Sequence, residues 1–379
     1  MTAGARLPRP DAVAEVAAAL DGDLALLRSR PYDPDEPFWR AADEHHVDLL
    51  LVDVARSSGA DQAWSADVQR RSRSAAVDAS VIRSLRDREL SRVLDVLAEV
   101  GVPCLLIKGA ALAHTLYRQP HARRRSDADL LVRVEDTGRV SDVLGAHGYA
   151  RAPEISGDHA TSQMHFDRPD CPDHRYALDI HWRIVNAHVF AGAVAHDAFA
   201  ASRIPVPGLG PNAWTLCTAH ALALACIHRV AHHQDSSDLL WLWDVHLLAS
   251  ALRRDETAMF VEHASRSATR AVCAHTLTMA HARFRTPAAV PLIDRVRPRT
   301  SEIEEASARF LGGGLSQTDI LRTDLASLGW RHGMALLREH LFPSVTYMRS
   351  LYDRWPRALL PAAYLHRIAC GAPKWLRRP

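Results

Sequence analysis

Residues 104–132 read CLLIKGAALAHTLYRQPHARRRSDADLLV, and this stretch decides the fold. It contains two short runs that are mainly apolar, 104–107 and 127–132, separated by an alanine-rich segment and a basic loop. Short apolar runs bounded by turn residues are typical of buried strands. We therefore predict a strand, a helix that ends near Tyr117, and a second strand that begins at Asp127.

Alternating elements continue toward the C-terminus. Residues 135–147 have helical spacing and end at Gly148, and two more strand candidates follow at 162–168 and 175–184. Strands that alternate with helices in so short a region indicate a small α/β or α+β unit. We predict an α+β fold with a small mixed sheet at its core and extensive flanking helices.

Helical periodicity dominates both sides of this core. Apolar residues recur at spacings of three and four in the stretches 10–30, 36–58, 65–100, 212–233 and 236–254. Three regions follow from this pattern: an N-terminal helical region (1–100), an α/β core (101–210) and a C-terminal helical region (211–379).

Composition excludes several classes of protein. The 379 residues carry a formal net charge of +2 and are 47% hydrophobic, which is typical of a globular chain and gives no strong nucleic-acid signal. The six cysteines form no CxxC pair and indicate reduced thiols. No signal peptide or spanning segment is apparent, so we expect a cytoplasmic protein.

Lysine is rare in this chain. There are 44 arginines but only two lysines, Lys108 and Lys374. Lys374 lies in a basic C-terminal segment, Tyr352 to Arg378, which could bind a partner or an interface, or could simply pack with a basic outer face. Lys108 is followed by Gly109 at the end of the first predicted strand. Glycine lets backbone approach a phosphate and an ammonium binds phosphate, although chance would also place a lysine somewhere.

Three aspartates are candidates for a metal site. Asp127 and Asp129 are two residues apart on a predicted strand, so their side chains share one face. Adjacent carboxylates repel unless a cation lies between them, and Mg²⁺ prefers carboxylates and phosphate oxygens. Asp179 in the strand around 177–182 is a third carboxylate. The alternatives are a solvated strand end for the pair and an edge strand with one polar face for Asp179.

Two further groups of residues allow either a functional or a purely structural interpretation. The arginines at 123–125 precede the aspartates and could hold phosphates or form a solvated basic loop. His228 and His232 are four residues apart on a predicted helix, with His233 next to them. This spacing could bind zinc, but the HExxH pattern is absent, so a polar helix end is the other interpretation.

The ordered set of these segments resembles a known family. CLLIKGAALA (104–113), RRRSDADLLV (123–132), Gly148-Tyr149, LDIHW (178–182) and LLWLWDV (239–245) occur in the order found in a family of bacterial nucleotidyltransferases within the DNA polymerase β-like superfamily. The C-terminal segments LFPS (341–344) and YLHR (364–367) are also similar, so the resemblance covers about residues 80–370.

The resemblance implies a nucleotidyltransferase-like fold and a set of site residues. Asp127, Asp129 and Asp179 match its metal-binding and catalytic acids, where glutamate is more usual at the third position. The expected cofactor is Mg²⁺ or Mn²⁺. The residues expected to contact the donor, or to orient the residues that do, are Lys108, Gly109, Arg123, Ser126 and His181.

The expected reaction moves a nucleotidyl group from a nucleoside triphosphate to a hydroxyl or phosphate of a small-molecule, sugar or peptide acceptor in biosynthesis or tailoring. Lys108 stands where the wider superfamily has Gly-Ser or Gly-Gly. This departure leaves open glycosyl transfer from a nucleotide-sugar. A non-catalytic nucleotide-binding module is a third alternative, and the presence of all three aspartates argues against it.

Overall fold

The computed structural model describes residues 10–376, except 156, 158, 172–175, 194–195 and 299–303. Those ranges contain a seven-stranded mixed sheet in the order β3-β4-β5-β2-β1-β7-β6, which confirms the α+β prediction. The strands are β1 (Leu105–Ile107), β2 (Asp127–Leu131), β3 (Ala150–Arg151), β4 (Gln163–Asp167), β5 (Ala177–His181), β6 (Ile204–Pro205) and β7 (Trp214–Thr215).

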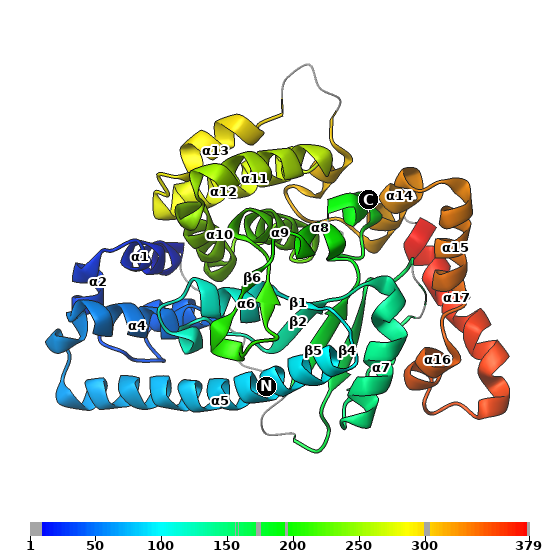
Figure 1. Cartoon of the computed structure of the whole chain (residues 1–379), viewed down its shortest axis with the longest axis horizontal. Coiled ribbons are helices and arrows are strands. Elements are labelled where there is room, and N and C mark those ends of the chain that lie inside the picture. The colour runs from blue at the N-terminus through cyan, green and yellow to red at the C-terminus, as the bar shows by residue number, and fades with distance from the viewer. Residues whose placement is uncertain are drawn as a thin grey trace.

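Helices make up most of the remaining structure (Figure 1). The helices that precede the sheet are α1 (Pro10–Leu20), α2 (Leu24–Ser29), α3 (Pro37–Glu44), α4 (Asp48–Ser58) and α5 (Ala66–Glu99). Those within and after it are α6 (Lys108–Thr115), α7 (Thr137–Ala146), α8 (His196–Ala200), α9 (Thr218–Ala231), α10 (Leu239–Ala251), α11 (Arg254–Arg266), α12 (Arg270–Phe284), α13 (Ala289–Val296), α14 (Gln317–Ser327), α15 (Trp330–Leu341), α16 (Val345–Leu351) and α17 (Leu360–Leu376).

The central strand is β2, which pairs antiparallel with β1 and parallel with β5. Because side chains alternate across a strand, the even-numbered residues of β1, β2 and β5 face one side of the sheet and the odd-numbered residues face the other. Leu106, Leu130 and Ile180 on the even side pack against α5 and α7 in one core. On the odd side, Leu105 and Leu131 pack against α9 and α12 in a second core.

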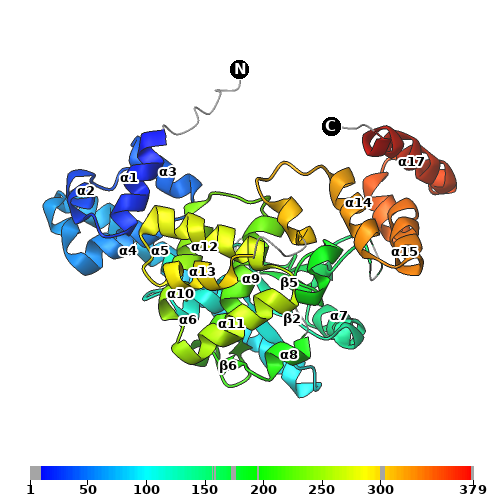
Figure 2. The ribbon, with the colours of Figure 1, turned by 90° about the horizontal axis from the view of Figure 1, so that it is seen from above.

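The two flanking helical regions meet in a third core. Trp39 and Leu51 of the N-terminal helices are buried together with Leu242 of α10 and Leu277 of α12. In Figure 1 the sheet lies between α5 below and α9–α13 above, while α1–α4 occupy one end. Figure 2 shows α14–α17 at the opposite end of the molecule. Segments far apart in the chain therefore enclose the sheet together.

Helix α5 follows the 65–100 prediction closely. Ser65 caps its N-terminus by accepting a hydrogen bond from the backbone N–H of Val68. Its buried residues Leu90, Val93 and Leu94 recur at helical spacing against the sheet. Gly101 follows the helix with a φ of 71°, a left-handed conformation that glycine adopts at low cost.

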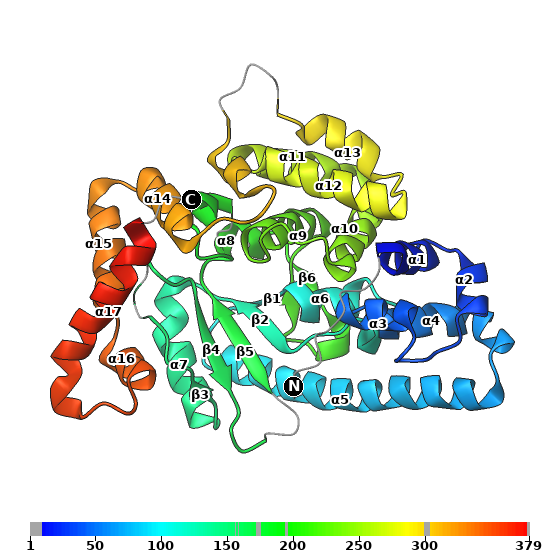
Figure 3. The ribbon, with the colours of Figure 1, turned by 180° about the vertical axis from the view of Figure 1, so that it is seen from behind.

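Figure 3 shows β4, β5 and α7 from the other side of the molecule.

Some predicted helices are interrupted or start later. The 10–30 stretch breaks before Asp23, whose side chain accepts from the N–H of Ala25 to begin α2. The 36–58 stretch breaks at His46, which has a φ of 58°. The 212–233 helix begins only at Thr218, because Thr215 belongs to β7 and pairs with Leu106 of β1.

Two observations concern regions outside the sheet. None of the described helices is both long enough and apolar enough to cross a membrane. The predicted basic tail is only partly described: α17 is present, but the side chain of Lys374 and residues 377–379 lie outside the described part of the chain. Its proposed contacts stay a prediction.

Candidate functional site

The three predicted aspartates lie on one face of the sheet. Asp129 of β2 and Asp179 of β5 are opposite each other in the parallel register, and Asp127 is two residues earlier on β2. Ligand atoms of Asp129, Asp179 and His181 all lie within 4.8 Å of one another. The parallel pairing of β2 and β5 brings together residues that are 50 positions apart in the sequence.

Lys108 delivers its ammonium to these acids. Its Nζ lies 2.7 Å from Asp129 Oδ1 and 3.2 Å from His181 Nε2, and His181 Nε2 lies 2.9 Å from the same carboxylate oxygen. Lys108 has a φ of 53° at the junction of β1 and α6. A side chain in this left-handed region costs roughly 1–2 kcal/mol, and such strain is concentrated at functional sites. The strained turn directs a cation into the acidic cluster.

The two aspartates of β2 carry opposite perturbations. Burial, together with the neighbouring charges of Asp129 and Asp179, raises the pKa of Asp127 to about 6. Burial also acts to raise the pKa of Asp129, but Lys108 and the hydrogen bond with His181 hold that pKa well below its usual range. The carboxylate of Asp129 is therefore ionised and its negative charge is balanced by Lys108, whereas the carboxylate of Asp127 has no cationic partner among the described residues.

Asp179 has a histidine partner that sequence reasoning missed. His165 of β4 lies opposite Asp179, and its Nδ1 is 2.6 Å from Asp179 Oδ1. Its Nε2 is 3.0 Å from Asp167 Oδ2. The hydrogen bond with Asp179 raises the pKa of His165 to about 9, so the imidazole is protonated at neutral pH. The alternation of polar Gln163, His165 and Asp167 along β4 was the available signal.

Arg123 and Gly109 are in close contact. A Cβ on Gly109 would lie 2.4 Å from Arg123 Nη1, so this position needs a glycine. The Arg123 guanidinium is buried and bonded to Asp244 of α10, at 2.6 Å from Nη2 to Oδ2. Tyr117 donates a hydrogen bond to the same carboxylate at 2.7 Å. Arg123 therefore joins the loop before β2 to the helical layer.

A cavity of about 730 Å³ opens over the acidic cluster. Its walls come from α4, α5, α6, α9, α10 and β2, and include Gly109, Ser126 and Asp179. Six cationic side chains and four carboxylates line it: Arg83, Arg86, Lys108, Arg123, Arg124, Arg125, Asp48, Asp127, Asp129 and Asp179. His181 is fully buried and is not part of the lining. Most of these cations are paired with carboxylates, but the concentration of guanidinium groups provides donors for an anionic ligand.

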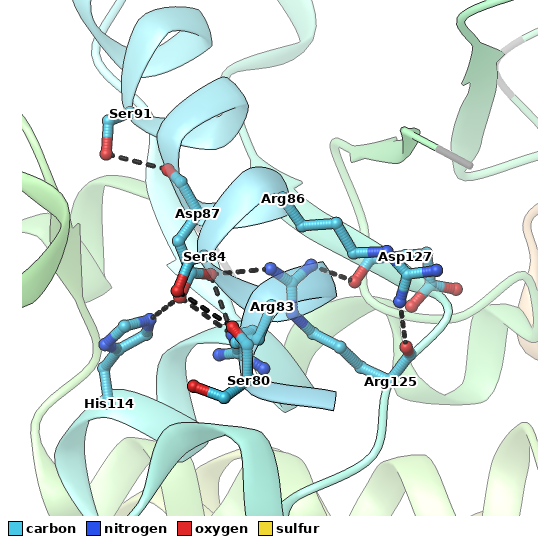
Figure 4. Close-up of polar contacts among 9 residues, drawn as sticks. All are labelled: Ser80, Arg83, Ser84, Arg86, Asp87, Ser91, His114, Arg125 and Asp127. Carbon is cyan, nitrogen blue, oxygen red and sulfur yellow. Dashed lines mark hydrogen bonds and ion pairs between the residues drawn. The ribbon is translucent and has the colours of Figure 1, made fainter. Parts of the chain in front are cut away.

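Arginines of α5 contribute to a cluster of charged side chains around Asp87 on one side of the cavity (Figure 4). Asp87 Oδ1 is 2.8 Å from Arg83 Nε and 2.9 Å from Arg125 Nη2, and its Oδ2 is 3.0 Å from His114 Nε2. Burial acts to raise the pKa of Asp87, but His114 and the arginines lower it to about 2. Arg86 donates to the carbonyl of Arg125 at 2.8 Å. The spacing of Arg83, Arg86 and Asp87 along α5 was the sequence signal that could have identified this group.

Several buried donors of cavity-lining residues have no hydrogen-bond partner among the described residues. They are Arg83 Nη2, Arg124 Nε, Arg125 Nε and Trp241 Nε1. An unpartnered buried donor costs roughly 1–3 kcal/mol. Because these atoms have almost no solvent-accessible surface, they lie behind the cavity surface rather than on it.

Three histidines at the end of α9 complete the cavity. His228, His232 and His233 each present a ring nitrogen within 4.8 Å of the others. Burial lowers the pKa of all three imidazoles, and Lys108 lowers them further; the pKa of His232 falls to about 4. They are neutral at pH 7. The sequence paired His228 with His232, and the structure adds His233.

The mixed sheet and the acidic residues on adjacent strands define a nucleotidyltransferase-like protein. The family described as an uncharacterised nucleotidyltransferase matches residues 33–285, more than half of the chain, and the protein belongs to that family. No curated protein matches the chain. Membership supports nucleotidyl transfer as the general activity, with a nucleotide donor and an acceptor.

Proposed function

We propose that this protein transfers a nucleotidyl group from a nucleoside triphosphate to a hydroxyl or phosphate of a small acceptor, with a divalent ion at Asp127, Asp129 and Asp179. The observation that carries the proposal is the shared face of these three carboxylates beneath a cavity lined by arginine side chains. A triphosphate would accept hydrogen bonds from the arginine side chains that line this cavity.

The acidic residues fit a hard cation. The carboxylate of Asp127 makes no hydrogen bond or ion pair within the described ranges, and its pKa is raised by burial and by the nearby charges of Asp129 and Asp179. Both contacts of Asp129 involve Oδ1, which leaves Oδ2 for a further ligand. Oxygen donors of this kind suit Mg²⁺. When bound, Mg²⁺ would supply Lewis-acid stabilisation of charge on the donor phosphates.

The protein's own residues supply the remaining functions. Arg83, Arg124 and Arg125 bind and orient the phosphate chain, because a bidentate guanidinium matches phosphate geometry. Lys108 holds Asp129 in its charged form and adds positive charge beside the reacting phosphate. Asp179 accepts the proton of the acceptor hydroxyl at Oδ2, while His165 fixes the orientation of this carboxylate through Oδ1.

Calorimetry of the intact protein with nucleoside triphosphates, in the presence and absence of Mg²⁺, tests the proposal. We expect Mg²⁺-dependent binding that Asp127→Asn and Asp179→Asn abolish. Asp255→Asn is the matched control, because Asp255 is exposed on α11 far along the chain from the acidic cluster. Binding that is unaffected by the two site variants would overturn the assignment of the site.

Mass spectrometry of acceptors then separates the reactions. A nucleoside monophosphate increment with release of pyrophosphate supports nucleotidyl transfer. A hexose increment from a nucleotide-sugar would contradict it. Nucleotide binding without modification of any acceptor in a panel of sugars, peptides and cell metabolites would instead favour a binding module.

A further inference from the structure

We propose that His228, His232 and His233 form a second metal site on the cavity wall, for a late first-row divalent ion such as Zn²⁺. One nitrogen from each ring lies within 4.8 Å of the others, so small rotations of the side chains would bring all three to the bonding distance of one ion. Imidazole nitrogen suits Zn²⁺, whereas the carboxylates of β2 and β5 suit Mg²⁺. The two sites therefore differ in ligand chemistry.

The end of α9 brings the three rings together. His228 and His232 are one helical turn apart, with ring centroids 5.2 Å apart and planes inclined by 16°. Helix α9 ends at Ala231, and the backbone N–H groups of both His232 and His233 bond to the carbonyl of His228. This tightened turn places the His233 ring 4.6 Å from the His228 ring.

A strained turn holds this arrangement in place. Gln234 and Asp235, the next two residues, have φ values of 50° and 59°. Two consecutive non-glycine residues in this region cost roughly 1–2 kcal/mol each, and such strain persists only where the surroundings impose it. Arg229 imposes it here: its guanidinium is fully buried and lies 2.5 Å from Asp235 Oδ1. His275 Nε2 contacts the other oxygen at 3.0 Å.

The rings are oriented but their nitrogens are available. The indole of Trp241 stacks on His233 with centroids 4.4 Å apart and an angle of 21° between the planes. None of the six ring nitrogens makes a hydrogen bond to the described part of the protein. A merely structural histidine cluster would be expected to bond these nitrogens to neighbours. Three neighbouring imidazole nitrogens without hydrogen-bond partners among the described residues indicate that they bind one ligand together.

The site would have one open position. Three protein ligands with a free fourth position distinguish reactive zinc sites from closed structural ones. His232 is exposed, and all three histidines line the same cavity as Asp127 and Lys108. The open position would accept water or an oxygen or nitrogen atom of a molecule in the cavity.

Metal titration of the chelator-treated full-length protein tests this site without any nucleotide. We expect one equivalent of Zn²⁺ to bind by calorimetry, and Co²⁺ in its place to show the intense visible bands of a tetrahedral ion. Loss of an outer-shell contact alone costs roughly 10–100-fold in affinity, so His232→Ala/His233→Ala should lower it at least about 100-fold. Excess Mg²⁺ should not displace the zinc.

Two control variants make the result decisive. His121→Ala removes another histidine of the same cavity and should keep full zinc affinity. Asp127→Asn/Asp179→Asn removes carboxylates of the proposed Mg²⁺ site and should also keep it. Absence of zinc binding, or equal losses in His121→Ala, or loss only in the carboxylate variant, would overturn the proposal. Circular dichroism verifies that each variant is folded. Because the zinc titration uses no nucleotide, the proposed zinc site and the proposed nucleotidyl transfer can each be refuted without affecting the other.

Discussion

At the scale of single residues, the acidic cluster contains one aspartate whose charge is balanced by a lysine and one that has no cationic partner in the described part of the chain. Asp129 has Lys108 at 2.7 Å, whereas Asp127 has no partner of its own. The sequence predicted that these two side chains share a face, because strand periodicity fixes it. It could not predict their different charge states, because these depend on Lys108, His181 and Asp179, which strand pairing and the β1–α6 turn bring together.

Asp127→Asn should stabilise the metal-free protein at neutral pH. The folded pKa of Asp127, about 6, exceeds its ordinary value of 3.8, so the cost of ionising this carboxyl grows as the pH rises from 3.8 to 6 and is fully present above about 6. Removing that charge should raise the free energy of unfolding at pH 7.5 by about 1–3 kcal/mol. Denaturant titration should show the gain shrinking as the pH falls toward 4. A variant less stable than wild type at pH 7.5 would contradict this charge assignment.

Lys108→Met should have opposite effects on two ligands. Loss of the ammonium leaves Asp129 without its countercharge, so Mg²⁺ should bind several-fold more tightly while triphosphate affinity falls. Breaking a buried pair also costs about 3–5 kcal/mol of stability. Calorimetry with each ligand separately measures both effects. Lys108→Arg is the control that retains the charge, and weaker Mg²⁺ binding by Lys108→Met would show that Lys108 does not compete with the metal.

At the scale of elements, the sheet needs helices from both halves of the chain. The strands 104–107, 127–132, 162–168 and 175–184 were predictable from apolar runs and alternation, and the structure confirms the mixed core. The two-residue strands β3, β6 and β7 were not, because such short pieces have no periodicity and exist only through their neighbours. The breaks between α1 and α2 and between α3 and α4 were missed because local caps override a continuous apolar pattern.

The region boundaries 1–100, 101–210 and 211–379 stay a prediction. Helix α5 packs on the sheet, and β7 at 214–215 extends it, so contacts cross both boundaries. Among the site residues, His165 was missed because it acts through Asp179 on the neighbouring strand. Arg83 pairs with Asp87 one turn along α5, but the contacts of Asp87 with Arg125 and His114 come from other elements. Sequence spacing indicates which residues share a face of one element, but it does not show which residues of another element they meet.

Asp244→Ala should destabilise the junction between the β2 loop and α10. It removes the acceptor of the Arg123 guanidinium and of the Tyr117 hydroxyl, and leaves a buried cation unpaired. We expect a loss of about 3–5 kcal/mol in the free energy of unfolding. Asp255→Ala removes an exposed partner of Arg253 and should change it by less than about 1 kcal/mol. Equal losses in the two variants would show that the buried pair has no special weight.

At the scale of the whole molecule, the C-terminal helices attach to the sheet region through a few polar contacts. Glu339 of α15 accepts hydrogen bonds from the backbone N–H groups of His159 and Ala160, at 3.0 and 2.7 Å. Asp324 of α14 accepts from the N–H of His188 at 2.6 Å. These carboxylates bind backbone donors of the core and so fix helices that lie outside the family-matched residues.

Glu339→Ala should loosen that attachment while the protein stays folded. The N–H groups of His159 and Ala160 lose their acceptor, so we expect faster hydrogen exchange there and in α14–α17. Exchange in β2 and α5 should not change, and neither should Mg²⁺-dependent nucleotide binding. Glu262→Ala, an exposed position on α11, is the control. Uniformly faster exchange across the sheet would mean that the C-terminal helices are integral to the core.

The scarcity of lysine gives this protein a built-in chemical reporter. Only Lys108 and Lys374 carry side-chain amines, and Lys108 lies against Asp129 and the cavity. An amine-directed affinity reagent, such as a periodate-oxidised nucleotide, should therefore mark the cavity at one peptide. The fraction of that peptide left unlabelled would then measure occupancy of the site by any competing compound, so a library can be screened before the natural acceptor is identified.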